Sequence, residues 1–291
     1  MSTTVIIGIF DGVHRGHQEL LALAKKSGHV TALTFDPHPT SVFAPERTPS
    51  QIVPLEDRIA LLKKHGADEV VVIPFTKEFA ALSPAEFISQ ILISQLHASH
   101  VIVGENFTFG FKASGTAQTL QDSDAGFTTS IVKLEENRGV PVSSTRIRHL
   151  ITDGDIERAS ELLTRNHYLV GPVVHGEKRG REIGYPTANI GLSPLSTIPA
   201  DGIYAGWLTV EGERWPAAIS IGTNPTFPGV RGRQVEAYAL DQTGLDLYDK
   251  IATIEFVARL RDTLKFDGLD PLLVQMKKDC DQAKEILRKG N

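Results

Sequence analysis

The 291-residue sequence contains one cysteine, Cys280, and little else that would mark an exported or membrane protein. A single cysteine excludes an intrachain disulfide and a cysteine-based zinc site. No apolar stretch reaches membrane-spanning length, and no basic segment followed by an apolar one marks a signal peptide at the N-terminus. We therefore expect a cytoplasmic protein that has no membrane partner.

Basic residues are also fewer than acidic ones, with 30 Lys and Arg against 35 Asp and Glu. The net charge of −5 argues against a general nucleic-acid binder, although a few local cations and helix ends can still bind an anionic nucleotide. The sequence shows no internal repeat and no low-complexity tract. Its length is sufficient for two ordinary domains, each with its own core.

The stretch 8–17 is the most informative part of the sequence. An apolar run at 5–7 predicts a buried strand before it, and the run 18–26 predicts a helix after it. Such a strand-to-helix turn directs backbone N–H groups and the positive end of a helix toward a phosphate. His14 and His17, three residues apart, would share a helix face and suit negative charge that develops during phosphoryl chemistry. Three glycines let the turn approach a ligand closely: Gly8, Gly12 and Gly16.

From this pattern alone the histidine pair could also be part of a metal site or a surface feature. The run 10–17, Phe-Asp-Gly-Val-His-Arg-Gly-His, is similar to the His-x-Gly-His signature of the nucleotidyltransferase superfamily. Its surroundings resemble the FMN adenylyltransferase half of bacterial bifunctional FAD synthetases, which join riboflavin kinase and FMN adenylyltransferase in one chain. The resemblance implies catalytic roles for His14 and His17. It also implies nucleotide and phosphate contacts at Gly8, Phe10, Asp11, Gly12 and Gly16.

Short β-branched runs alternate with helical patterns through the rest of the first half. Strands are expected at 30–35, 69–73 and 101–103, with helices at 55–65 and from the capping box at 83–86 to about residue 96. This alternation is typical of a doubly wound parallel sheet, the Rossmann-like architecture of α/β domains.

Two polar loops follow predicted strands, at the edge where open parallel sheets bind ligands. The loop 36–39 could be a simple turn, and the loop 104–110 could be a turn packed on the core. In the family they resemble, both contact the flavin, which implies flavin contacts for Asp36, His38 and Asn106. Many members carry arginine where this chain has Thr108, so we leave Thr108 out of the site.

The run 142–148, Val-Ser-Ser-Thr-Arg-Ile-Arg, is either a plain helix N-cap with surface arginines or an anion site. It is similar to the Ser-Ser-Thr-x-Ile-Arg signature of the same superfamily. That resemblance implies nucleotide contacts for Ser144 and Thr145, and a contact of Arg148 with the leaving pyrophosphate.

Composition changes after a short helix at 155–163. We expect a linker at 164–167, with an adenylyltransferase domain at 1–163 and a kinase domain at 168–291. The second domain should be an antiparallel β-barrel, with a hairpin turn at 211–213 and a terminal helix that has Cys280 near its apolar stripe. Its strands are expected at 168–174, 203–210, 215–221, 235–240 and 252–257.

The stretch 176–189 combines glycines, cations and Pro-Thr-Ala-Asn. It is suited to polyphosphate, or it is a solvated hairpin. It resembles the riboflavin kinase signature, which implies that Thr187 and Asn189 hold Mg²⁺ with ATP and that Glu236 is the base for the riboflavin hydroxyl. Nucleotide contacts are implied for Gly176, Arg179, Gly180, Arg181, Gly184 and Pro186.

The resemblance covers nearly the whole chain and implies two reactions. The second domain would phosphorylate riboflavin to FMN, and the first would adenylylate FMN to FAD with release of pyrophosphate. We therefore expect riboflavin, FMN and ATP with Mg²⁺ as the small-molecule partners, no nucleic acid, and at most a weak homo-oligomer. Two alternatives remain open: a single-activity adenylyltransferase of the same superfamily, or a non-catalytic flavin-binding regulator.

Overall fold

The structure is a computed structural model, and it describes residues 3–176, 184–222 and 233–289. The chain forms two compact units, Met1–Ser144 and Thr145–Asn291, and each is described by itself. Within the described ranges, no helix is both long and apolar enough to cross a membrane.

The first unit is built on a sheet of five parallel strands in the order β3-β2-β1-β4-β7, which confirms the predicted doubly wound architecture. Its strands are β1 (Thr3–Ile7), β2 (His29–Asp36), β3 (Glu69–Pro74), β4 (Ala98–Gly104) and β7 (Thr128–Val132). Strand β7 was not predicted from the sequence. This edge strand starts Thr-Thr-Ser, and none of its side chains is fully buried, so it lacks the apolar run of the central strands.

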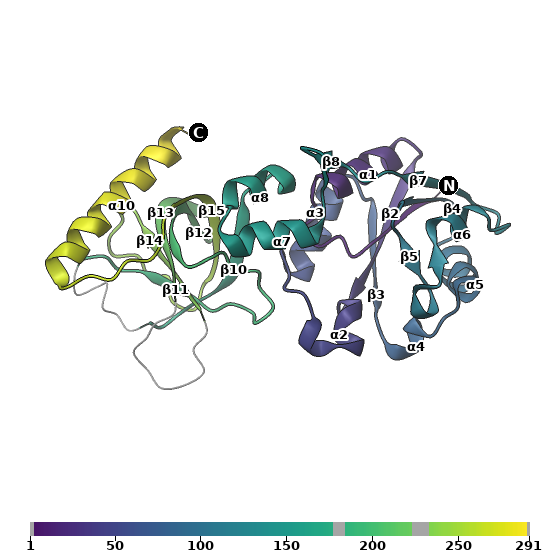
Figure 1. The fold of residues 1–291 in the computed structure, drawn as a ribbon, viewed down its shortest axis with the longest axis horizontal. Helices are drawn as coiled ribbons and strands as arrows, with labels where there is room; N and C mark the ends of the chain where they lie inside the picture. The colour runs from purple at the N-terminus through teal and green to yellow at the C-terminus, as the bar shows by residue number, and fades with distance from the viewer. Residues whose placement is uncertain (1–2, 177–183, 223–232, 290–291) are drawn as a thin grey trace. The chain divides into compact units, whose positions relative to one another are not determined.

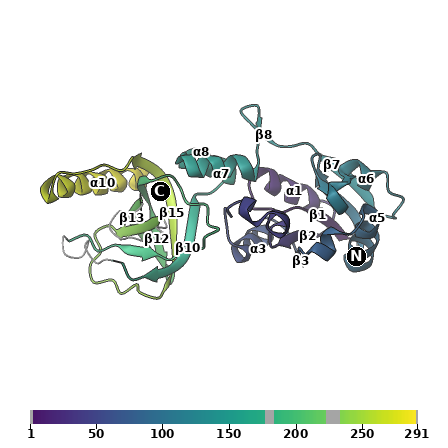
Figure 2. The same cartoon turned by 60° about the horizontal axis from the view of Figure 1, so that its bottom comes forward.

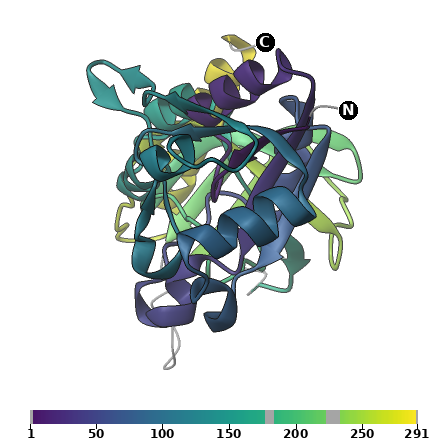
Figure 3. The ribbon, with the colours of Figure 1, turned by 90° about the vertical axis from the view of Figure 1, so that its right-hand side faces the viewer.

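Helices cover both faces of the sheet (Figure 1). The helices α1 (Arg15–Lys25) and α3 (Leu55–Lys64) connect the strands of one half. On the other side, α5 (Pro84–Glu86) runs directly into the π-helix η2 (Phe87–Gln95), with α6 (Ala117–Gln121) beside it. The blue helix at the front of Figure 3 is η2, which packs its apolar side chains into the core beneath it. The predicted capping box is present, with Ser83 and Glu86 bonding reciprocally.

The remaining elements of this unit are short. They are α2 (Pro39–Phe43), η1 (Pro45–Arg47), α4 (Lys77–Ala80), β5 (Thr108–Phe109), η3 (Phe111–Ala113), β6 (Gly115–Thr116), β8 (Glu136–Asn137) and β9 (Val140–Pro141). The strand order reverses at β1, which has β2 on one side and β4 on the other. In open α/β sheets such a switch point opens a crevice at the carboxyl ends of the strands.

The second unit contains a closed antiparallel barrel with the strand order β10-β11-β14-β13-β12-β15, as the sequence predicted. Its strands are β10 (His167–Val174), β11 (Ala188–Ile190), β12 (Gly202–Val210), β13 (Glu213–Gly222), β14 (Gln234–Ala239) and β15 (Ile251–Arg261). Strand β11 was not predicted, because three residues after a loop are too few to show a periodic pattern. The predicted hairpin is a two-residue turn in which Glu211 and Gly212 have φ of 51° and 87°, as a type I′ turn requires.

Three helices complete this unit: α7 (Ser144–Asp153), α8 (Ile156–Leu163) and the terminal α10 (Leu269–Lys289). By their contacts α7 and α8 group with the barrel, and β10 begins at His167, inside the stretch that we expected to be a linker. Helix α10 packs on β12, β13 and β15 (Figure 2). Cys280 is buried in this contact, as predicted, and burial raises the pKa of its thiol to about 11.

Candidate active sites

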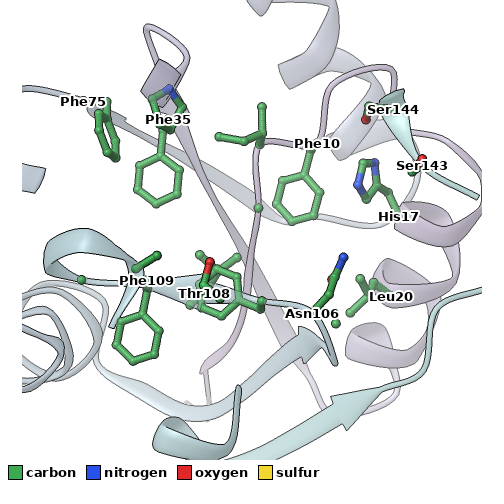
Figure 4. A pocket seen from close by; sticks show the side chains of 18 of the residues that line it. Phe10, His17, Leu20, Phe35, Phe75, Asn106, Thr108, Phe109, Ser143 and Ser144 are labelled. Carbon is green, nitrogen blue, oxygen red and sulfur yellow. The ribbon is translucent and has the colours of Figure 1, made fainter. Parts of the chain in front are cut away.

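A cavity of about 930 Å³ opens at the carboxyl ends of the parallel strands in the first unit. Figure 4 shows that it has two different ends. His17, Ser143 and Ser144 lie at one end, and Phe35, Phe75 and Phe109 lie at the other. Among the predicted site residues, Gly8, Phe10, His14, Gly16, His17, Asn106 and Ser144 line this cavity.

The β1–α1 turn forms the histidine end. His14 is the N-cap residue of α1 and His17 lies in its first turn. Their rings stack with centroids 3.6 Å apart, and Phe10 presents its ring to His17 at 5.1 Å. Burial, together with the neighbouring His14, lowers the pKa of His17 well below its usual range. His17 is therefore neutral at pH 7 and can donate one N–H without carrying a charge.

The turn has an unusual backbone. Phe10, Gly12 and Val13 have φ of 53°, 79° and 40°. Left-handed φ values are uncommon for residues other than glycine, cost on the order of 1–3 kcal/mol each, and persist only where surrounding contacts hold them. Of these three residues, only Gly12 could have been recognised from the sequence as suited to such a turn.

Asp11 supplies some of those contacts. Its carboxylate is buried and accepts hydrogen bonds from the backbone N–H groups of Ile52 and Val53, at 3.0 Å and 3.4 Å. Its carbonyl accepts a hydrogen bond from the Ser144 hydroxyl at 2.8 Å. In the described part of the unit, Asp11 and Gly12 are not among the cavity-lining residues. The geometry therefore gives the Asp11 side chain a role in holding the turn.

The aromatic end was largely missed by sequence reasoning. Nine phenylalanines of the described residues line this one cavity: Phe10, Phe35, Phe43, Phe75, Phe79, Phe87, Phe107, Phe109 and Phe111. The sequence did offer one signal for this end, because these phenylalanines are concentrated before residue 112. Asn106 and Thr108 also line the cavity, so Thr108, which we had left out of the site, is adjacent to it. Lys77, Lys112 and Lys133 supply positive charge to its wall.

Two residues predicted to contact the flavin form hydrogen bonds within the protein and do not line the cavity that the described residues form. Asp36 accepts a hydrogen bond from Arg58 at 3.4 Å, and His38 accepts one from the backbone N–H of Thr40 at 3.2 Å, which caps α2. Within the described residues, neither side chain belongs to the cavity lining. Thr145 and Arg148 lie in α7 and group with the second unit.

Three predicted kinase residues meet on the barrel. The Thr187 hydroxyl donates a hydrogen bond to a Glu236 carboxylate oxygen at 3.0 Å. Asn189 of β11 lies opposite Glu236 of β14 in the strand register. A Cβ on Gly176 would overlap the side-chain amide of Asn189, so an alanine at this position would displace that amide. The strand alternation turns Asn189 and Glu236 away from the buried barrel interior.

A second cavity, of about 520 Å³, lies beside this cluster. Pro186 and Thr187 line it on one side, and the segment 242–248 lines it on another. Gly184 is exposed and has a φ of 85°, which favours glycine. Arg179, Gly180 and Arg181 lie outside the described residues. The described ranges contain no group of three or more His, Cys, Asp or Glu side chains that could hold a metal ion.

Comparisons with known proteins agree with this two-unit arrangement. The FAD synthetase family model matches residues 1–146, and the riboflavin kinase model matches residues 163–287. The bifunctional riboflavin kinase/FMN adenylyltransferase of Listeria monocytogenes is 36% identical over 99% of this chain and 94% of its own length. The Bacillus subtilis protein with the same description is 36% identical over 97% of this chain and 91% of its own length.

The same fold occurs in a crystal structure described as a macrolide-efflux protein from Streptococcus pneumoniae. It has a TM-score of 0.88 and 33% identity, over 97% of this chain and 94% of that one. The family models and the nearly full-length relatives give one answer. The chain belongs to the family of bifunctional riboflavin kinase/FMN adenylyltransferases.

Proposed function

We propose that the two units of this chain divide the two reactions of its family between them. As a member of that family, the chain is an enzyme of FAD biosynthesis that phosphorylates riboflavin to FMN and adenylylates FMN to FAD. The barrel unit carries the kinase reaction, and the parallel-sheet unit carries the adenylyl transfer. The observation that supports this most directly is the two-ended cavity of the first unit.

The two ends of this cavity match the flavin ring and the phosphate of FMN: the phenylalanine-rich end suits the ring, and the histidine end suits the phosphate. The phenylalanine-rich end suits the flat, apolar flavin ring, because aromatic side chains bind such rings by stacking and edge contacts. Asn106 offers an amide to the polar edge of the ring, and Lys77 and Lys112 add positive charge to the wall. We assign Asp36 and His38 to flavin binding only through the loop that they stabilise.

Adenylyl transfer in this unit requires no strong base, because the FMN phosphate is already an anionic nucleophile. It attacks the α-phosphate of ATP, and pyrophosphate leaves with its bonding electrons. His14, His17 and the N-terminus of α1 stabilise the charge that develops at the α-phosphate. Ser144, at the histidine end of the cavity, binds the nucleotide. Nucleotide binding by Thr145 and pyrophosphate binding by Arg148 stay predictions from the sequence. No covalent intermediate with the protein is needed.

Phosphoryl transfer in the barrel depends on Glu236 as the general base for the riboflavin 5′-hydroxyl. The hydrogen bond from Thr187 orients its carboxylate. Thr187 and Asn189 present a hydroxyl and an amide oxygen close to this carboxylate, two neutral oxygen donors that suit a hard cation such as Mg²⁺ beside phosphate oxygens. When bound with ATP, Mg²⁺ neutralises charge on the phosphates. Gly176, Gly184 and Pro186 shape the nucleotide side. Nucleotide contacts of Arg179, Gly180 and Arg181 stay predictions from the sequence.

A cytoplasmic location, the absence of nucleic acid from its partners and a weak homo-oligomer stay predictions from the sequence.

The proposal is tested by incubating the purified chain with riboflavin, ATP and Mg²⁺ and separating the flavins over time. FMN that appears first, followed by FAD, is the expected result. FMN without FAD would contradict the assignment of the first unit. FAD formed only from supplied FMN would favour the single-activity adenylyltransferase. Flavin binding without any product would favour the regulator.

A further inference from the structure

We propose that Arg58 is a positioning residue for adenylyl transfer. Its guanidinium holds the Ile9 carbonyl and the Asp36 carboxylate, and so fixes the turn that carries His14 and His17. The inference rests on the proposed function of the first unit. No sequence motif pointed to Arg58, which lies in α3, outside the two nucleotidyltransferase signatures at 10–17 and 142–148.

Arg58 is a buried cation. The residue is 5% exposed, and its Nη1 donates to the Ile9 carbonyl at 2.8 Å while its Nη2 donates to Asp36 Oδ1 at 3.4 Å. Burial lowers the pKa of Arg58, and the carboxylates of Asp11 and Asp36 oppose this shift. Burying a charge is costly unless it is paired, so these partners explain how the cation is retained.

The Ile9 carbonyl receives a second hydrogen bond. The hydroxyl of Thr34, a fully buried residue in β2, donates to it at 3.0 Å. Two donors on one carbonyl fix the peptide that precedes Phe10, where the chain turns left-handed with φ of 53°. Arg58 and Thr34 are therefore placed to stabilise the uncommon backbone of the turn.

A short series of contacts leads from this carbonyl to the reacting groups. Phe10 follows Ile9, its ring contacts His17 at 5.1 Å, and His17 stacks on His14 at 3.6 Å. Among the described residues, Arg58 is not part of the cavity lining. Its effect on the reaction must therefore pass through Ile9 and Asp36, so it is not a catalytic residue.

The test compares steady-state kinetics of Arg58→Met, Arg58→Lys and Thr34→Val with the unaltered chain. The matched control is Arg47→Met, because the Arg47 side chain is 82% exposed and lies in the same unit. Each variant is assayed for FAD formation from FMN and, separately, for FMN formation from riboflavin. The second reaction reports on the barrel of the same molecules and serves as an internal reference.

We expect Arg58→Met to lower kcat for FAD formation about 100-fold, the effect of misplacing reacting groups by about 1 Å. KM for ATP should change less than about threefold, because the lost interaction acts on the orientation of the turn. Arg58→Lys should recover part of kcat, because lysine can still donate to one of the two acceptors. Thr34→Val should lower kcat about tenfold, the effect of one lost buried hydrogen bond. Arg47→Met and all rates of FMN formation should be unchanged.

Unchanged kcat in folded Arg58→Met would overturn the inference, as would a parallel loss of both reactions or a rise in KM alone. If neither Arg58 variant folds, Thr34→Val decides, and unchanged kcat there would overturn the inference. Failure of the unaltered chain to form FAD would overturn the proposed function and this inference with it. FAD formation that is insensitive to Arg58 would overturn the inference alone.

Discussion

His167 should make the stability of the barrel depend on pH. This residue begins β10, is 1% exposed, and donates from Nε2 to the carbonyl of Thr197 at 2.9 Å. Its ring stacks on Phe256 with centroids 5.9 Å apart. Burial, the largest cause, lowers the pKa of His167 from 6.5 to about 4. The folded barrel therefore holds a neutral imidazole at pH values where the unfolded chain binds a proton.

The sign and the size of the effect follow from this difference. The contribution of neutral His167 to the free energy of unfolding is complete above pH 6.5. It is lost as the pH falls toward 4, because between these pH values the unfolded chain binds a proton at His167 and the folded chain does not. At 1.36 kcal/mol per pKa unit, the full loss is roughly 3 kcal/mol. Between pH 7 and pH 5 the loss should be about 2 kcal/mol.

The barrel offers its own probe for this measurement. Both tryptophans of the chain lie in it, Trp207 on β12 and Trp215 on β13, so tryptophan fluorescence during urea unfolding reports on this unit. The unaltered chain should lose about 2 kcal/mol more stability between pH 7 and pH 5 than His167→Gln does. His175→Gln, at an exposed histidine of the same unit, is the matched control and should behave like the unaltered chain. Equal pH dependence in the unaltered chain and His167→Gln would refute the reasoning.

Three further predictions concern the active sites. His17→Ala should lower FAD formation from FMN by about 10²–10³-fold and leave FMN formation from riboflavin intact, which flavin chromatography measures; loss of both activities in a folded chain would contradict the division of labour. Glu236→Gln should do the reverse, removing riboflavin phosphorylation while FAD still forms from supplied FMN. Gly176→Ala should displace the Asn189 amide and slow riboflavin phosphorylation. Gly222→Ala is the control and should leave the rate unchanged, because its new Cβ would meet only an ordinary contact at 3.9 Å. Equal rates in the two variants would show that the close approach of Gly176 to Asn189 has no kinetic role.

Local patterns in the sequence were sufficient for much of the fold. The strand before Gly8, the capping box at Ser83 and the turn at Glu211 depend on residues within a few positions of one another. Such features are governed by backbone preferences and side-chain periodicity, which a sequence displays directly. The same is true of the alternation of strands and helices that predicted the parallel sheet. The family resemblance rested on the motifs around His14, Ser144 and Thr187, which are contiguous stretches.

The tertiary structure decided what these local features do together. It gathered phenylalanines between Phe10 and Phe111 around one cavity, and it closed the barrel with the three-residue strand β11. It also directed Asp36 toward Arg58, a partner that the sequence analysis had not considered. These contacts join residues tens of positions apart. No periodicity encodes such pairings, since they depend on how strands and helices pack. Local patterns in the sequence therefore determined most of the elements and the chemistry that they carry, whereas packing determined strands such as β7 and β11 and which side chains reach the cavity.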